Sequence, residues 1–182
     1  MNLGQMLLVA GALTILATVT LSINTTILQA YVVSYDSEAT IDAISIGQAM
    51  VDEIQSQVFD SIAYHTLVTD PSNLTPGSKL GPDLDSEKTA LNGRVDTLPY
   101  LSAVKFNDVD DYNKYTRIVV SPHLGKFTVA DTVYYVQNSN LDISSSTQTW
   151  FKKIKVTIRH PNLYQPVVIK SLVVYRRYVV PS

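Results

Sequence analysis

Apolar residues dominate the first part of the chain, and the first charged residue is Asp36. From Leu3 to Ile23 the sequence LGQMLLVAGALTILATVTLSI is interrupted only by Gln5, by glycines and by Thr and Ser residues. A helix of about 21 residues is roughly 30 Å long, which matches the thickness of the hydrocarbon core of a bilayer. The pattern therefore predicts an apolar helix that lies in a membrane or in a protein environment of similar polarity.

A cleaved signal peptide is one alternative interpretation of this segment. Signal peptides combine a basic N-terminal region, a shorter apolar run and a cleavage site with small residues. No Lys or Arg precedes the apolar run here, and the polar residues from Ser22 to Thr26 lead into further apolar residues. We therefore expect a helix that is retained, and a simple membrane anchor remains a second alternative.

The helical pattern continues beyond the apolar segment. No proline occurs before Pro71, and apolar or small residues recur at spacings of three and four, as on one face of an amphipathic helix: Ala43, Gly47, Met50, Ile54 and Val58. We predict one near-continuous helix from about residue 2 to about residue 62, roughly 90 Å long. The apolar part of this helix covers residues 1–35. The whole helix, residues 1–62, forms a stem.

Small residues recur every seven positions in the apolar part, at Gly4, Gly11, Thr18 and Thr25. A stripe of small residues lets helix backbones approach one another closely, which favours helix association in apolar surroundings. The alternative is that small residues are common in membrane helices for other reasons. We predict that this small-residue stripe packs against another helix, and that threonines such as Thr14 donate hydrogen bonds to preceding carbonyls.

The rest of the chain has a different composition. Prolines and glycines are concentrated in residues 63–99, which predicts a loop region with a short helix near Ser86–Leu91. Lys153–Ile158 alternates strictly between polar and apolar residues, which is typical of a half-buried antiparallel strand. Five runs predict strands of a globular head over residues 100–182: Tyr100–Phe106, Tyr115–Val120, Lys126–Val136, Trp150–His160 and Val167–Val179. The fold class is therefore α+β, a long N-terminal helix followed by an antiparallel sheet.

Charge is separated along the chain. Residues 1–78 contain seven acidic residues and no basic ones, whereas seven basic residues and no acidic ones follow Asp142. An acidic helix and a basic sheet, in the same subunit or in a neighbour, would be electrostatically complementary; the alternative is that both are solvated faces. The chain has no cysteine, so a disulfide is excluded, and its net charge of −2 gives no reason to expect nucleic acid as a partner.

Candidate chemistry is sparse. The three histidines fit no metal signature, and neither a nucleophile elbow nor a phosphate-binding glycine loop occurs, so we expect no enzyme and no cofactor. The group Asp108, Asp110 and Asp111 predicts a calcium site formed by oxygen ligands, with a solvated turn as the alternative. The sequon Asn73-Leu-Thr makes Asn73 a candidate for glycosylation.

Three segments together resemble type IV pilins and pseudopilins. AISIGQAMVDEIQSQVFD, from Ala43 to Asp60, is similar to the end of their long helix, and NDVDDYN, from Asn107 to Asn113, resembles a "DVDDYDG" loop. FKKIKVTIRHPNLYQPVVIKSLVVYRR, from Phe151 to Arg177, is similar to their closing hairpin. The resemblance covers most of the chain. Gln5 stands where such proteins carry a glutamate if Met1 is the first mature residue; a processed form, a lineage without the usual leader, and cleavage after Gly4 all remain open.

The resemblance implies assembly as the function. It implies a helical homopolymer in which the N-terminal helices pack through Met1, Gln5 and the small-residue stripe, often after N-terminal methylation. The implied partners are identical subunits, a prepilin peptidase, a membrane platform protein and an assembly ATPase, with the inner membrane as the location before assembly and the cell surface afterwards. Two alternatives stay open at this point: a pseudopilin of a secretion system like type II, and a membrane-anchored binding domain that does not polymerise.

Overall fold

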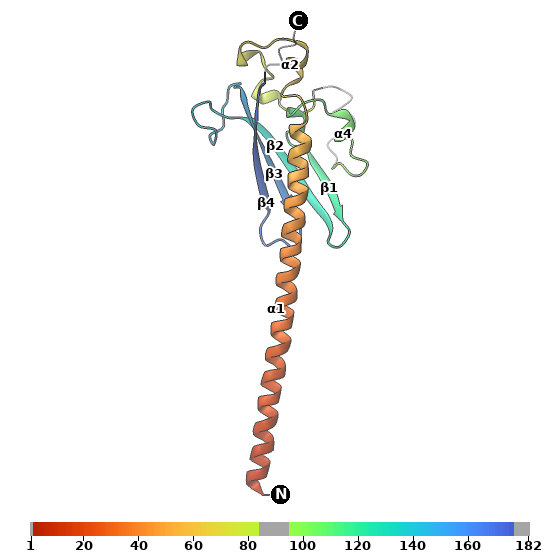
Figure 1. The fold of residues 1–182 in the computed structure, drawn as a ribbon, viewed down its shortest axis with the longest axis vertical. Helices are drawn as coiled ribbons and strands as arrows, with labels where there is room; N and C mark the ends of the chain where they lie inside the picture. Colours follow the sequence, from red (N-terminus) through yellow and green to blue (C-terminus); the bar gives the residue numbers. More distant parts are fainter. Residues whose placement is uncertain (1, 84–94, 177–182) are drawn as a thin grey trace.

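A single helix forms the long axis of the molecule, and a small sheet packs on its C-terminal half (Figure 1). The computed structural model describes residues 2–83 and 95–176. Helix α1 spans Leu3–Gln55 without a break, so the stem is continuous where its threonines are concentrated. The predicted short helix near Ser86–Leu91 and the predicted assembly residue Met1 lie outside the described residues.

The helix ends earlier than the predicted residue 62. Ser56 follows α1, and its backbone N–H donates to the carbonyls of Asp52 and Glu53, after which the chain turns. Val58 then forms a parallel bridge with Asp108, and Asp60 begins helix α2 (Ser61–His65) by accepting a hydrogen bond from the N–H of Ile62. The end of α1 is thus determined by a pairing with a distant loop, which the helical periodicity does not reveal.

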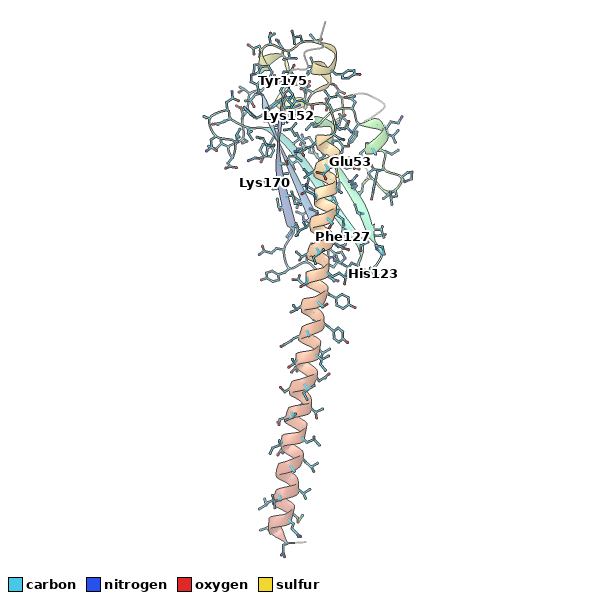
Figure 2. The ribbon with its side chains drawn as sticks, in the orientation of Figure 1. Glu53, His123, Phe127, Lys152, Lys170 and Tyr175 are labelled. Atoms are coloured by element: carbon cyan, nitrogen blue, oxygen red, sulfur yellow. The ribbon has the colours of Figure 1, made fainter. Side chains whose placement is uncertain are left out.

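The N-terminal part of α1 projects away from the rest of the described chain. From Asn2 to Tyr35 every side chain is exposed, and side chains project from all sides of the helix (Figure 2). The threonine hydroxyls donate to carbonyls three or four residues earlier, as predicted; Thr14 Oγ1, for example, lies 2.8 Å from the Gly11 carbonyl oxygen. Because these hydroxyls are paired within the helix, they add little polarity to its surface.

Four strands form one antiparallel sheet in the order β1-β2-β3-β4. Their bounds are Thr116–Ser121 for β1, Gly125–Tyr135 for β2, Phe151–Arg159 for β3 and Val167–Val174 for β4. These strands confirm four of the five predicted runs and the α+β class, although β4 ends at Val174 and the last residues of its predicted run, 177–179, lie outside the described residues. The predicted strand Tyr100–Phe106 is wrong, because the segment contains helix α4 (Ser102–Lys105), where Asp96 accepts hydrogen bonds from the N–H groups of Leu101 and Ser102.

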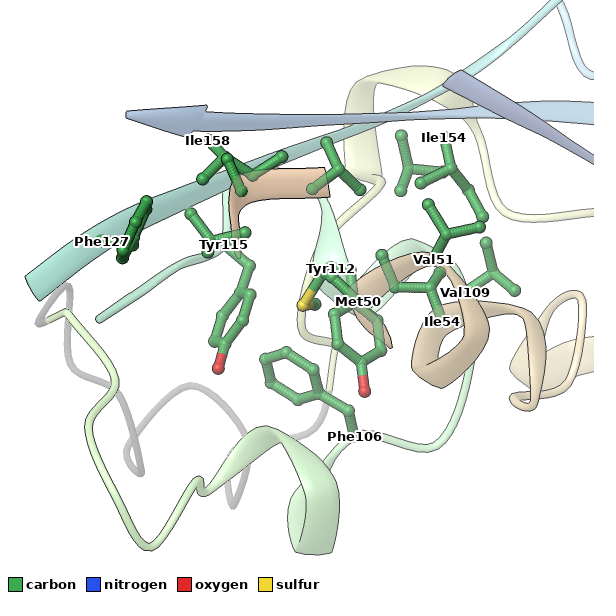
Figure 3. Packing of buried hydrophobic residues seen from close by; sticks show 14 of the residues in the cluster. Met50, Val51, Ile54, Phe106, Val109, Tyr112, Tyr115, Phe127, Ile154 and Ile158 are labelled. Atoms are coloured by element: carbon green, nitrogen blue, oxygen red, sulfur yellow. The ribbon is translucent and has the colours of Figure 1, made fainter. Parts of the chain in front are cut away.

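The core lies between α1 and the inner face of the sheet. Helix α1 contributes Ala39, Ala43, Gly47, Met50, Val51 and Ile54, which confirms the predicted amphipathic face except at Val58, beyond the end of the helix. Three residues of β3, Ile154, Val156 and Ile158, are completely buried beneath them, as the alternating pattern predicts (Figure 3). Three short 3-10 helices, Pro71–Asn73, Gly77–Lys79 and Asp110–Tyr112, position the loops around this core.

Gly47 sets the distance between the helix and the sheet. A Cβ atom at this position would lie 2.6 Å from Ile158 Cδ1 and 2.7 Å from Ile169 Cδ1, so these terminal methyl groups would have to shift. The residue is helical, so glycine is favoured here by packing and not by backbone conformation. Close packing of this kind orients α1 firmly against β3 and β4.

Candidate functional site: an exposed apolar stem and a buried lysine cluster

The exposed part of α1 is the largest unpaired apolar surface on the described chain. Its apolar side chains stay between about half and three-quarters exposed, from Leu3 (77%) to Ile27 (49%). Monomeric soluble proteins seldom expose apolar patches larger than a few hundred Å². By length and composition α1 is able to cross a membrane. This surface is therefore suited to contact with lipid or with other protein.

The small-residue stripe has no explanation within one chain. A Cβ atom added at Gly4 or at Gly11 would meet nothing within 4 Å, in contrast to Gly47. Gln5, the other predicted assembly residue here, uses its side-chain oxygen to accept a hydrogen bond from the N–H of Asn2, at 3.4 Å. Thr18 and Thr25 direct their hydroxyls to the carbonyls of Ile15 and Ser22. Packing among the described residues therefore does not require glycine at Gly4 or Gly11.

A completely buried lysine lies in the head where α1 and the sheet meet the loops. Lys152 Nζ donates hydrogen bonds to the Phe59 carbonyl oxygen at 2.7 Å, to Asp110 Oδ1 at 2.7 Å and to Asp60 Oδ2 at 3.3 Å. The side chains of Lys152 and Asp60 are 0% exposed and that of Asp110 is 3% exposed. A buried ammonium group requires such partners, because desolvation is otherwise costly.

Aromatic rings surround this lysine. The Phe59 ring lies 4.5 Å from Nζ and the Tyr135 ring lies 5.3 Å from it. Phe59 and Tyr135 are also members of a second apolar cluster, with Val68 and Leu74. The rings attract the ammonium charge and exclude water from the contacts of Lys152. We call Lys152, Asp60, Asp108 and Asp110 the buried lysine cluster.

The carboxylates of this cluster differ in how they are held. Asp60 accepts hydrogen bonds from the N–H groups of Ile62 and Thr75, and Asp108 accepts them from the N–H groups of Ser61, Asp110 and Asp111, the one from Ser61 at 2.6 Å. Asp110 has no backbone donor among the described residues; its side chain contacts Lys152 and Asp108. Burial, opposed by the charge of Lys152, raises the pKa of Asp110 to about 8.

The three segments that carry the resemblance to pilins meet in this cluster. Phe59 and Asp60 close the first segment, Asp108 and Asp110 belong to the second, and Lys152 belongs to the third. Segments that are distant in the sequence are thus joined through one ammonium group. Sequence reasoning missed Lys152, although a signal was present: its position places it on the same side of the strand as the inward-facing Ile154, Val156 and Ile158.

The aspartates predicted to bind calcium are used in other ways. Asp108 and Asp111 accept hydrogen bonds from backbone N–H groups, and Asp110 pairs with Lys152. Within residues 2–83 and 95–176, no three acidic or histidine side chains are grouped so as to hold a metal ion. Calcium binding by Asp108, Asp110 and Asp111 remains a prediction from sequence alone. Asn73 is exposed at the end of a 3-10 helix, and its glycosylation also remains a prediction.

A second buried polar group ties the end of α1 to the edge strand β1. Arg117 Nη1 lies 2.7 Å from Glu53 Oε2, and the hydroxyl of Tyr112 donates to Glu53 Oε1 at 3.0 Å. The guanidinium also lies over the Tyr100 ring, 4.5 Å from its centre. These contacts hold the last turns of α1 from the side opposite the lysine cluster.

Asp131 lies buried beside this group without a hydrogen bond. It is 2% exposed, and neither of its carboxylate oxygens has a partner among the described residues; the same holds for Arg117 Nε. Burial, opposed by the charge of Arg117, raises the pKa of Asp131 to about 8. Sequence reasoning did not single out this residue, although its position places it on the same side of β2 as the buried Phe127, Val129 and Val133.

The predicted charge complementarity is present in part within one subunit. Acidic residues at the end of the stem segment pair with basic residues of the sheet in two places, Glu53 with Arg117 and Asp60 with Lys152. Other charges remain apart: Lys155 and Lys170 face each other across β3 and β4, and the structure gives them no ion pair among the described residues. Whether those charges meet a neighbouring subunit stays a prediction.

Comparison with protein-family models, with curated proteins and with solved structures finds no match to this chain. The architecture is nevertheless pilin-like, with a long N-terminal apolar helix and a C-terminal antiparallel sheet. The apolar helix is suited to anchoring in a membrane.

Proposed function

We propose that this protein is a structural subunit that polymerises into a type IV pilus-like filament through packing of its N-terminal helices. The observation that carries the proposal is the exposed apolar stem, which continues as one unbroken helix into the core of the head. A stem of this kind needs to be covered along its whole length, and helices of identical neighbours provide an apolar cover of matching length. The small-residue stripe, which has no role within one chain, supports close helix contacts.

Assembly on this scheme exchanges one apolar environment for another. Before assembly the stem lies in the membrane, and in the filament the stems of neighbouring subunits replace the lipid around residues 3–35. The transfer costs little apolar burial, because protein and lipid both exclude water. By resemblance, a prepilin peptidase, a platform protein and an assembly ATPase act before and during this step.

The head is built to remain attached to the stem. The core side chains of α1, the Glu53–Arg117 pair and the buried lysine cluster hold the helix against the sheet and loops. A filament subunit needs this attachment, because tension along the filament passes from stem to stem and from stem to head. A hinged membrane anchor has no such need.

The first test is negative-stain electron microscopy of material sheared from native cells, with peptide mass spectrometry of the same fraction. Thin filaments composed mainly of this chain are expected. A chain that remains with the membrane, with no filaments containing it, would favour the pseudopilin or the anchored-domain alternative. A peptide that begins at Met1 or at Gln5 would also establish the mature N-terminus.

A matched pair of variants tests the helix contacts directly. Gly11→Leu places a large side chain on the small-residue stripe, whereas Ala12→Leu places the same side chain on an adjacent face of the helix. We expect Gly11→Leu to abolish filaments while membrane insertion stays normal, and Ala12→Leu to be tolerated. Filaments that are equally abundant in both variants would remove the stripe from the proposal.

A further inference from the structure

The contact between Lys152 and Asp110 places an amine and a carboxyl group together in surroundings that exclude water. Nζ and Oδ1 are 2.7 Å apart, and neither side chain is more than 3% exposed. The rings of Phe59 and Tyr135 cover the ammonium group. Buried reacting groups held at contact distance gain most of the advantage of an intramolecular reaction, because the cost of bringing them together is met by folding.

We propose that Lys152 and Asp110 form an intramolecular amide bond, a covalent cross-link between strand β3 and the 3-10 helix Asp110–Tyr112. The new bond joins Lys152 Nζ to Asp110 Cγ, and the bond from Cγ to one carboxyl oxygen breaks. The ammonium and carboxylate groups together already contain every atom needed, and one water molecule leaves. No oxidant, reductant or activating nucleotide is consumed.

Asp110 is the carboxyl group of the cluster best suited to react. Asp60 and Asp108 each accept two or more hydrogen bonds from backbone N–H groups, which hold their oxygens in place. The Asp110 carboxyl group receives no backbone donor among the described residues. Rotation about its Cβ–Cγ bond, a soft torsion, turns the two carboxyl oxygens without moving either backbone, so that the face of the carboxyl group is presented to Nζ.

The neighbouring aspartates supply the proton transfers. Asp60 Oδ2 lies 3.3 Å from Nζ and accepts the proton that Lys152 must lose before it attacks. Asp108 contacts the carboxyl group of Asp110 and holds it in place, and the two protons that Nζ loses pass by way of Asp60 to the oxygen that leaves as water. The Phe59 carbonyl oxygen, 2.7 Å from Nζ, holds the amine in place throughout.

A second lysine–aspartate pair in the same chain serves as a comparison for this reaction. Lys153 Nζ lies 2.7 Å from Asp142 Oδ1, the same distance as in the buried pair, but the Asp142 side chain is 90% exposed. Water solvates that carboxylate and competes with amide formation, so we expect Lys153 and Asp142 to remain an ion pair. Burial, and not distance, distinguishes the two contacts.

The cross-link is independent of the proposed filament function. It ties the loop that contains Asp108 and Asp110 to strand β3. The head therefore resists forced unfolding whether or not the chain polymerises. The bond connects β3 to the loop that pairs with Val58 just after α1. The cross-link is detected by peptide mass alone, so failure of the filament proposal would not affect it. Failure of the cross-link proposal would likewise not affect the filament proposal.

Tryptic digestion of the full chain, extracted from its native membrane or filament, tests the bond directly. An uncross-linked chain yields separate peptides 106–114 and 127–152. The cross-linked chain yields one species that joins residues 106–114 to residues 127–153, because blocked Lys152 is not cleaved, with the mass of one water, about 18 Da, missing. Quantitative recovery of the two separate peptides from the wild-type protein would overturn the proposal without any variant.

Substitutions at three aspartates test which side chains form the cross-link and which assist the reaction. Asp110→Ala is expected to abolish the joined species, whereas Asp110→Asn is expected to give a product of identical mass by loss of ammonia instead of water. Asp60→Asn is expected to reduce the cross-linked fraction at least tenfold, and an unchanged fraction would remove Asp60 from the mechanism. Asp142→Ala, at the exposed pair, is the matched control and is expected to leave the joined species unchanged.

Discussion

Glu53 and Arg117 lie 2.7 Å apart and connect the last turn of the long helix to the edge strand of the sheet. Arg117 is almost completely buried, and Glu53 also receives a hydrogen bond from Tyr112. Removal of one partner of a buried pair leaves an uncompensated charge, which costs about 3–5 kcal/mol in proteins, less where the remaining partner is partly exposed. The pair therefore contributes to the attachment of stem and head in two ways, through its own contact and through the tyrosine.

Replacement of Arg117 by Met is expected to lower the free energy of unfolding of the head by about 2–3 kcal/mol, since Glu53 is about one-quarter exposed and retains Tyr112. Thermal or chemical unfolding of the detergent-solubilised chain measures the change. Glu53→Gln, Arg117→Met and the double variant form a thermodynamic cycle. Additive effects in that cycle would show that the pair contributes no coupling energy.

Gly47→Ala is expected to destabilise the head, because the added Cβ would lie 2.6 Å from Ile158 Cδ1. Overpacking of a core typically costs about 1–3 kcal/mol. Gly11→Ala is the matched control: the same change in the same helix meets no atom within 4 Å in one chain. Alanine is favoured over glycine in a helix by about 1 kcal/mol at both positions, so the melting temperature of the solubilised chain is expected to fall for Gly47→Ala, where the clash outweighs this gain, and not to fall for Gly11→Ala. Equal melting temperatures would contradict the packing at Gly47.

Asp131→Asn is expected to reduce the pH dependence of stability. Burial raises the pKa of Asp131 from 3.8 to about 8, so the folded chain retains a proton that the unfolded chain releases between these pH values. The folded state is therefore favoured below about pH 4, and that contribution is lost as the pH rises through 8. The effect is on the order of a few kcal/mol.

Denaturant unfolding of the wild type and of Asp131→Asn, measured from pH 4 to pH 9, tests this expectation. Asp110 also has a raised pKa and is present in both proteins, so the difference between them isolates Asp131. Arg117 and Glu53 are the charged groups that act on Asp131, and neither changes in this comparison. Parallel stability curves for the two proteins would mean that Asp131 does not titrate in this range.

Calcium removal is expected to leave the head unchanged. The carboxylates of Asp108 and Asp110 are engaged with backbone N–H groups and with Lys152, so a divalent cation would have to displace these contacts. The melting temperature in the presence of excess chelator is compared with that in millimolar calcium. A clear rise with calcium, lost in Asp111→Asn, would instead support the site predicted from the sequence.

A single cysteine introduced into the stem allows assembly to be measured by cross-linking between subunits. No other thiol reacts, because the chain has no cysteine of its own. Ser22→Cys is expected to give covalent dimers when filaments are treated with a bifunctional thiol reagent that spans the distance between neighbouring stems, since packed stems place copies of this position on adjacent helices. The same treatment of solubilised monomers is the control. Dimers that form equally in both samples would reflect collision and not filament packing.

Much of the architecture follows from periodicity alone. The apolar run from Leu3, the three-and-four spacing of Ala43, Gly47, Met50 and Ile54, and the alternation around Ile154 determine a long helix and a half-buried strand. These features are local, since each depends on residues a few positions apart. The head sheet follows in the same way, as four of its predicted strands are present.

Only the tertiary structure decided where α1 ends, what replaces the predicted strand Tyr100–Phe106, and which charges are buried. Helix α1 ends where Val58 pairs with Asp108, and the segment near Ser102 is shaped by the carboxylate of Asp96. Lys152 is buried because three distant segments supply its oxygen and aromatic partners together. The physical reason is common to all three cases: the free energy of a polar group depends on partners that folding brings from far along the chain, whereas the apolar periodicity of a helix or strand is contained in neighbouring residues.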